Sequence, residues 1–266
     1  MKKCVMAFGA HSDDIEIQCG GTLLKFKSKG YELIYVVVTT NDMGFSHGYK
    51  ENIEVRRKEA EKGAKFLGAM PLFLNFKKFD IANDKNKIVS FIEDSNIFNK
   101  WKKLPGREPI SVAFFIPECV IEVANLIAKY EPEIVLTHSP DDIHPDHHST
   151  SVLVYRAFKE ASEKMKLGSL YLWGPGSWGF ITEFNPDIFI DISNYIDKKN
   201  EAISQHASQA VEWIKTYFGE RTARWGKKIG VKHAEGFYKV KDILTKDKIS
   251  YINTLERRFL EYKKRN

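Results

Sequence analysis

The sequence predicts an α/β fold in which a mainly parallel sheet is flanked by helices on both faces. Short, continuous apolar runs alternate along the chain with longer amphipathic stretches. Continuous apolar runs are typical of strands buried on both faces, and strands that alternate with helices are typical of parallel sheets. No internal repeat, low-complexity tract or linker divides the chain. We therefore expect residues 1–266 to form a single domain.

Each element in the amino-terminal part of the chain has a local signal. The helical pattern that opens at Gly20 and Gly21 stops at Gly30, a residue type that suits the end of a helix. In the following helix, Ala60 and Ala64 fall on one side and charged residues on the other. We expect strands at residues 4–9, 33–39 and 72–74 and helices at residues 20–30 and 51–68.

The elements of the carboxyl-terminal part follow from prolines and from apolar periodicity. Pro117 suits the first turn of a helix, and Pro132 prevents that helix from continuing. The last element is a charged, partly amphipathic helix. We expect helices at residues 117–131, 149–166, 194–218 and 246–266 and strands at residues 134–137, 170–173 and 187–191.

Two segments interrupt the alternation of strand and helix. Residues 76–116 are rich in Lys, Asn, Asp and Phe and are long for a connection within a compact domain. We interpret them as an insertion packed over the edge or mouth of the sheet. Residues 174–186 form a second candidate loop, with Trp178 and Phe180 inside it and Trp173 beside it. These aromatic residues suit either the core or a platform for a ring of a ligand.

Composition and charge exclude several classes of protein. The chain has 43% apolar and 29% charged residues, as expected of a globular protein. Its 41 Lys and Arg against 35 Asp and Glu give a net charge of +6, but the lysines are spread out rather than gathered into a nucleic-acid-binding stripe. No apolar run reaches the length of a membrane span, and three scattered cysteines do not form a disulfide framework. We expect a cytoplasmic protein with neither nucleic acid nor membrane as partner.

Two clusters of histidine and aspartate, at residues 11–16 and 138–148, follow two of the predicted strands. The carboxyl ends of parallel strands meet at one edge of a sheet, where ligands bind. Imidazoles and carboxylates suit a divalent metal such as Zn²⁺. Helix capping by Asp13 or Asp14 is an alternative explanation. Because five of the chain's 8 histidines lie in the two clusters, we predict a metal site.

Other catalytic patterns are absent from the sequence. No Gly-x-Gly-x-x-Gly follows the first strand, and no phosphate-binding Lys-Ser/Thr follows Gly20 and Gly21, so a dinucleotide or nucleotide site is not expected. No Gly-x-Ser-x-Gly elbow is present, and nothing marks a cysteine as a nucleophile.

The two clusters resemble the signatures of a known family, the PIG-L/LmbE deacetylases. The family patterns are His-Pro-Asp-Asp-x-Glu, followed by Gly-Gly-Thr, and a later His-Pro-Asp-His. This sequence reads His11-Ser12-Asp13-Asp14-Ile15-Glu16 with Gly20-Gly21-Thr22, and then His144-Pro145-Asp146-His147. Weaker similarities lie at Arg56-x-x-Glu59, Lys199, His206-Ala207-Ser208-Gln209 and Ala234-Glu235-Gly236-Phe237.

The resemblance covers most of residues 3–240. It implies a Rossmann-like α/β fold and zinc-dependent hydrolysis of an N-acyl group, usually an N-acetyl group on a glucosamine unit. The sequence departs from the family at Ser12, where the usual residue is Pro. That change removes a backbone restraint but no metal ligand. The length of segment 76–116 is a second departure, and it bears on the substrate rather than on the reaction.

The resemblance also implies roles for individual residues. His11, Asp14 and His147 correspond to the metal ligands, and Asp13 corresponds to the general base that takes a proton from water. A metal site of this kind is suited to Zn²⁺, with Fe²⁺ as the alternative.

A protonated His144 would stabilise the oxyanion, and Asp146 would orient His144 and favour its charged form. Arg56 would bind sugar hydroxyls, unless it forms a surface ion pair with Glu59 or a neighbour. Glu16 is interpreted as structural. The sequence does not assign roles to His138, Asp141, Asp142, His148 and His206.

These residues lead to an expected activity: metal-dependent removal of an N-acetyl group from a small glucosamine-containing molecule. A related amidase acting on a non-sugar amide, such as a thiol conjugate or antibiotic precursor, is the alternative enzyme. A metal-binding module without turnover is the non-enzymatic alternative. It is disfavoured because Asp13 and His144 both lie beside the ligands. The expected partner is an N-acetyl glycoside, and a homo-oligomer is compatible with the sequence.

Overall fold

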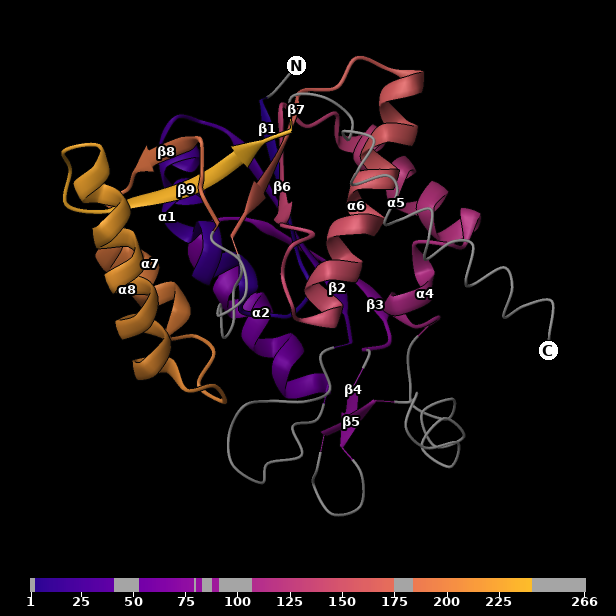
Figure 1. The fold of residues 1–266 in the computed structure, drawn as a ribbon, viewed down its shortest axis with the longest axis horizontal. Coiled ribbons are helices and arrows are strands. Elements are labelled where there is room, and N and C mark those ends of the chain that lie inside the picture. Colours follow the sequence, from indigo (N-terminus) through magenta and orange to yellow (C-terminus); the bar gives the residue numbers. More distant parts are fainter. Residues whose placement is uncertain are drawn as a thin grey trace.

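A computed structural model describes residues 3–40, 53–78, 80–82, 88–90, 107–174 and 184–240. Its main sheet contains seven strands: β1 (Cys4–Gly9), β2 (Glu32–Thr39), β3 (Met70–Phe76), β6 (Ile134–His138), β7 (Ser169–Trp173), β8 (Ile188–Asp191) and β9 (Ala234–Lys239). Their order in the sheet is β3-β2-β1-β6-β7-β9-β8 (Figure 1). The first five are parallel, and β9 runs antiparallel to both β7 and β8. The predicted mainly parallel α/β fold is therefore confirmed.

Helices cover both faces of this sheet. They are α1 (Asp14–Ser28), α2 (Ile53–Leu67), α4 (Ile110–Ala113), α5 (Pro117–Tyr130), α6 (Pro145–Lys164), α7 (Ile196–Ile203) and α8 (Val211–Lys228). One layer contains α4, α5 and α6, and the other contains α1, α2 and α7, with α8 packed on its outside (Figure 1). None of the helices in the described part of the chain is long and apolar enough to cross a membrane.

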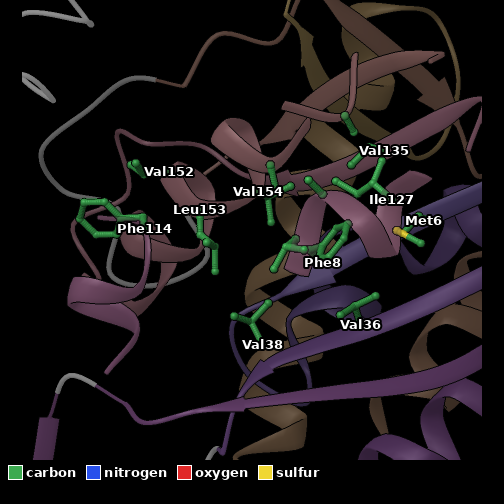
Figure 2. Packing of buried hydrophobic residues seen from close by; sticks show 14 of the residues in the cluster. Met6, Phe8, Val36, Val38, Phe114, Ile127, Val135, Val152, Leu153 and Val154 are labelled. Atoms are coloured by element: carbon green, nitrogen blue, oxygen red, sulfur yellow. The ribbon is translucent and has the colours of Figure 1, made fainter. Parts of the chain in front are cut away.

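The apolar core lies in two layers because successive side chains of a strand point to opposite faces of the sheet. Met6 and Phe8 of β1 pack with Val36, Val135 and the helices α5 and α6, as Figure 2 shows. Val5 and Ala7 of the same strand face α1 and α2. Burial on both faces explains why this strand reads as a continuous apolar run.

The strand order reverses its direction between β1 and β6. From β1 the chain moves outward to β2 and β3, and it then returns to form β6 on the other side of β1. In an open α/β sheet, ligands bind at such a switch point, outside the carboxyl ends of the strands. Both predicted clusters, at residues 11–16 and 138–148, follow these two strands.

The helix expected to begin at Gly20 begins six residues earlier, at Asp14. Gly20 and Gly21 lie inside the helix rather than at its boundary. A Cβ added to Gly21 would come within 2.8 Å of Ile192, so this glycine allows close packing of α1 against its neighbour. The helix expected at residues 149–166 likewise begins earlier, at Pro145.

The single helix predicted for residues 194–218 is wrong: α7 ends at Ile203 and α8 begins at Val211. The turn between the helices is fixed by a long-range contact, in which Ser208 donates from N to Glu59 Oε1 at 2.8 Å. Strand β9 was not predicted as a strand, and β3 is longer than the expected 72–74.

Part of the predicted insertion is described. It contains a short antiparallel pair, β4 (Asp80–Ala82) and β5 (Ile88–Ser90), beyond the end of β3 (Figure 1). The chain then returns to the main sheet, where Arg107 donates from N to the carbonyl of Asn75 at 2.9 Å. The predicted helix at 246–266 and the residues Trp178 and Phe180 lie outside the described residues.

Candidate metal centre

The structure brings together three of the side chains expected to bind a metal. His11 follows β1, Asp14 opens α1, and His147 lies in the first turn of α6. His11 Nδ1 lies 3.1 Å from His147 Nε2 and 3.5 Å from Asp14 Oδ2. Asp14 Oδ1 lies 3.3 Å from His147 Nε2. All three residues are buried. Two imidazole nitrogens and a carboxylate therefore converge on one point, as a divalent ion requires.

The outer nitrogens of both histidines contact carboxylates. His11 Nε2 lies 3.0 Å from Asp146 Oδ2, and His147 Nδ1 lies 2.8 Å from Asp142 Oδ2. A carboxylate on the outer nitrogen holds the proton there and turns the lone pair of the inner nitrogen toward a metal. The donor set therefore fits a metal ion.

Electrostatics lead to the same conclusion. Burial raises the pKa of the Asp14 carboxyl, but the nearby His147, His138 and His11 outweigh it and hold that pKa well below its usual range. Burial lowers the pKa of His147, but Asp14 and Asp142 outweigh it and raise that pKa to about 10. The carboxylates around His147 therefore favour a positive charge at this point.

Asp146 and Asp142 have partners that the sequence did not identify. The carboxylate of Asp146 was expected to orient His144, but its contact is with His11. Burial raises the pKa of Asp146, yet the hydrogen bond and charge of His11 lower it well below the usual range. Asp142 also accepts a hydrogen bond from the His144 backbone N–H at 2.9 Å, which fixes the loop before α6.

His144 differs from the expected imidazolium. Its Nδ1 accepts the backbone N–H of Asp146 at 3.2 Å, so the ring caps the start of α6. Burial and the neighbouring His147 and His11 lower the pKa of His144 to about 2, although Asp146 acts in the opposite direction. The environment thus favours a neutral ring with its proton on Nε2, which still donates a hydrogen bond.

Asp13 lies beside the proposed ligands and is held by Arg56. Arg56 Nη2 donates to Asp13 Oδ1 at 3.0 Å, and Nη1 donates to Glu59 Oε2 at 3.1 Å. Within the described part of the chain, Asp13 Oδ2 accepts no hydrogen bond. One oxygen of Asp13 is therefore oriented and the other is open.

The side chain of Arg56 has almost no exposed area that a substrate could contact. Its side chain is 1% exposed, and Glu59 also accepts from Ser208 Oγ at 2.6 Å. The expected ion pair with Glu59 exists, but it is buried rather than at the surface. The contacts place Arg56 behind Asp13 rather than in a sugar-binding surface.

Buried polar residues support the loop that carries Asp13. The hydroxyl of Tyr35 contacts Glu16 Oε2 at 2.7 Å and the backbone carbonyl of Ser12. Glu16 Oε1 lies 3.1 Å from His206 Nε2, and both side chains are fully buried. Glu16 is thus structural, as expected. The role of Tyr35 was missed, although a hydroxyl within a continuous apolar run is a signal that could have revealed it.

The other unassigned residues are now placed. His138 ends β6 and is completely buried beside Asp14. His148 Nδ1 lies 2.7 Å from the carbonyl oxygen of Pro140, while Asp141 is exposed. Trp173 is 1% exposed and donates from Nε1 to His138 Nδ1 at 3.1 Å, so it has no face for a ligand ring.

Comparisons with known proteins identify the family of the chain. Residues 6–158, more than half of the chain, match the family model described as PIG-L, GlcNAc-PI de-N-acetylase. The chain is 26% identical over 250 residues to the diacetylchitobiose deacetylase of Thermococcus kodakarensis, covering 88% of this chain and 82% of that protein. It is 25% identical over 228 residues to the 4-oxalmesaconate hydratase of Pseudomonas putida, covering 80% and 76%.

A solved structure has the same fold. The N,N′-diacetylchitobiose deacetylase from Pyrococcus horikoshii aligns with a TM-score of 0.66 at 24% identity, over 90% of this chain and 84% of that one. The family model spans both histidine clusters and the sheet between them. The chain therefore belongs to the PIG-L/LmbE family of metal-dependent deacetylases.

Proposed function

We propose that this protein removes the N-acetyl group from a glucosamine-containing small molecule by hydrolysis. The observation that carries the proposal is the open Oδ2 of Asp13 beside the converging donors of His11, Asp14 and His147. A base next to a metal centre is the arrangement that amide hydrolysis by water needs. The glucosamine unit is supported by the family description and by the diacetylchitobiose deacetylases among the relatives.

His11, Asp14 and His147 would hold a divalent ion, zinc by the chemistry of the donors, with Fe²⁺ as the alternative. When bound there, such an ion would supply Lewis-acid polarisation of the amide carbonyl and of the attacking water. Asp13 takes a proton from the attacking water through its open oxygen. The water oxygen bonds to the carbonyl carbon, the C–N bond breaks, and Asp13 returns the proton to the leaving amine. The products are acetate and a free amine.

His144 completes the site as a neutral donor. Because its Nδ1 is engaged by the Asp146 backbone N–H, its Nε2–H is the group free to donate to the developing oxyanion. A neutral imidazole loses no proton in this role, so the proton transfers are left to Asp13.

Acetate release tests the proposal directly. We expect the zinc-loaded enzyme to release acetate from N-acetylglucosamine glycosides such as diacetylchitobiose. A chelator should abolish the activity, and added Zn²⁺ should restore it. Metal-dependent acetate release from non-sugar amides alone would favour the related amidase. Release of no acetate from either class, together with hydration of 4-oxalmesaconate, would instead favour the activity named for the Pseudomonas putida relative.

Arg56→Lys tests whether Arg56 positions the base. Lysine keeps the charge but cannot donate to Asp13 and Glu59 with the same planar fork. We expect kcat to fall about 100-fold with KM unchanged, because small displacements of a catalytic group cost rates of this order. The control is Arg57→Lys on the exposed side of the same helix, which should change neither constant. A rise in KM with kcat unchanged would instead show that Arg56 binds substrate.

A further inference from the structure

His138 is enclosed by two N–H donors and one carboxylate. Trp173 Nε1 lies 3.1 Å from its Nδ1, on the neighbouring strand where the two residues are in register. Its Nε2 lies 3.0 Å from the backbone N of Ala10 and 3.2 Å from Asp14 Oδ2. The ring is completely buried, so no solvent can compensate for a mismatched contact.

The number of contacts satisfied decides where the ring proton lies. With the proton on Nε2, the ring accepts from Trp173 and donates to Asp14, and only the contact from the Ala10 N–H to Nε2 is lost, so two of the three contacts are satisfied. With the proton on Nδ1, only the contact with Ala10 is satisfied, the indole N–H meets another N–H, and a lone pair faces a carboxylate. A doubly protonated ring would satisfy only Asp14. The indole nitrogen is always a donor, so Trp173 cannot adapt to the other forms.

We propose that Trp173 fixes His138 as the Nε2–H tautomer, so that His138 is a positioning residue for Asp14 and not a ligand of the metal. Distances alone would allow His138 to be a metal ligand, because the donor atoms of Asp14, His138 and His147 lie within 4.8 Å of one another. A neutral imidazole that has a proton on Nε2 cannot offer that nitrogen to a metal. The tautomer therefore excludes His138 from the ligand set that its distances alone would allow.

In this tautomer, the two carboxylate oxygens of Asp14 have different partners. Oδ2 accepts from the His11 backbone N–H at 2.6 Å and from His138, while Oδ1 faces His147 Nε2. Two donors on one oxygen fix the orientation of the carboxylate. A ligand held by a second residue in this way binds its metal more tightly, and loss of such a residue costs about 10- to 100-fold in affinity.

Ring-nitrogen NMR of ¹⁵N-histidine-labelled protein reads the tautomer directly, with zinc-free and zinc-loaded wild type compared. The His138 signals are assigned from their loss in His138→Gln. We expect a protonated Nε2 and an unprotonated Nδ1 on His138 in both states, with zinc shifting His11 and His147 only. In Trp173→Phe, the His138 signals should move toward a mixture of tautomers, and zinc affinity should fall about 10-fold. Trp225→Phe removes a buried indole N–H elsewhere and should do neither.

Two substitutions of His138 separate the effect of its N–H donor from the effect of its size. His138→Gln keeps an N–H donor for Asp14, whereas His138→Leu has none, so zinc affinity should fall further in the leucine variant. Equal affinities in the two variants would contradict the inference, as would a proton on Nδ1 or a zinc-bound Nε2 in the wild-type spectrum. The wild-type spectrum, assigned with His138→Gln, decides even if Trp173→Phe or His138→Leu does not fold. The inference rests on the proposed metal centre, but its test does not use acetate release, so either proposal can fail alone.

Discussion

Asp13→Asn is expected to reduce kcat for acetate release by about 10²- to 10⁴-fold, the range that a positioned general base contributes. Asparagine keeps an oxygen that can accept from Arg56, so the contact at 3.0 Å need not be lost. It cannot take a proton from water at the position of Oδ2. The substitution thus removes the chemistry of the base while retaining its shape, its neighbours and the adjacent proposed ligand Asp14.

Zinc content separates this loss from damage to the metal site. The purified Asp13→Asn protein should bind one equivalent of zinc as the wild type does, measured by elemental analysis after dialysis. Glu61→Gln is the matched control, because it also neutralises one carboxylate but on an exposed face of α2. We expect wild-type kcat for this control. An Asp13→Asn enzyme that retains zinc and more than a tenth of the wild-type kcat would exclude Asp13 as the base.

The elements that were predicted correctly have local causes. Strand β1 is buried on both faces, so all of its residues are apolar or small and the run is visible without knowledge of its neighbours. The histidine clusters were placed at one sheet edge because the carboxyl ends of parallel strands must meet there. The three side chains proposed as ligands lie close together, since His11, Asp14 and His147 each lie within the first turn after a strand or at the start of a helix.

The elements that were missed depend on contacts between distant segments. Strand β9 contains Glu235 and Gly236, which are unfavourable in a buried strand when read alone. Glu235 is tolerated there because Gly21, Thr22 and Lys199 donate to its carboxylate. No proline marks the break between α7 and α8 in the sequence. The break is fixed by a hydrogen bond from Ser208 N to Glu59, which lies on another helix.

The roles of Arg56 and Asp146 were not predictable for the same reason. A family motif shows that an arginine is present. Whether that arginine contacts substrate or another side chain depends on how deeply it is buried. Arg56 is enclosed by α2 and the turn at Ser208, which are 152 residues apart in the sequence. The carboxylate of Asp146 lies near both His11 and His144, and only the three-dimensional arrangement shows which ring it contacts.

The buried pair of Lys199 and Glu235 should have the largest effect on stability. Lys199 Nζ lies 2.6 Å from Glu235 Oε1, and both side chains are 1% exposed. Glu235 also accepts from Gly21 N at 3.0 Å and Thr22 N at 2.7 Å, which joins β9, α7 and the middle of α1. Lys199→Met leaves the carboxylate buried without its ion-pair partner. Removal of one partner of a buried ion pair costs about 3–5 kcal/mol, a large share of the stability of a typical domain.

Urea unfolding of zinc-free protein measures this cost without the contribution of metal binding. The exposed pair Lys58 and Glu54, at 2.7 Å, supplies the control, because Lys58→Met should cost less than about 1 kcal/mol. Glu235→Gln combined with Lys199→Met should be less destabilised than the sum of the single variants, since the double change removes both charges. If Lys199→Met cost no more than Lys58→Met, the pair would not be the link that holds α1 against β9. In that case, packing of Gly21 against Ile192 would have to hold the helix that begins at the proposed ligand Asp14.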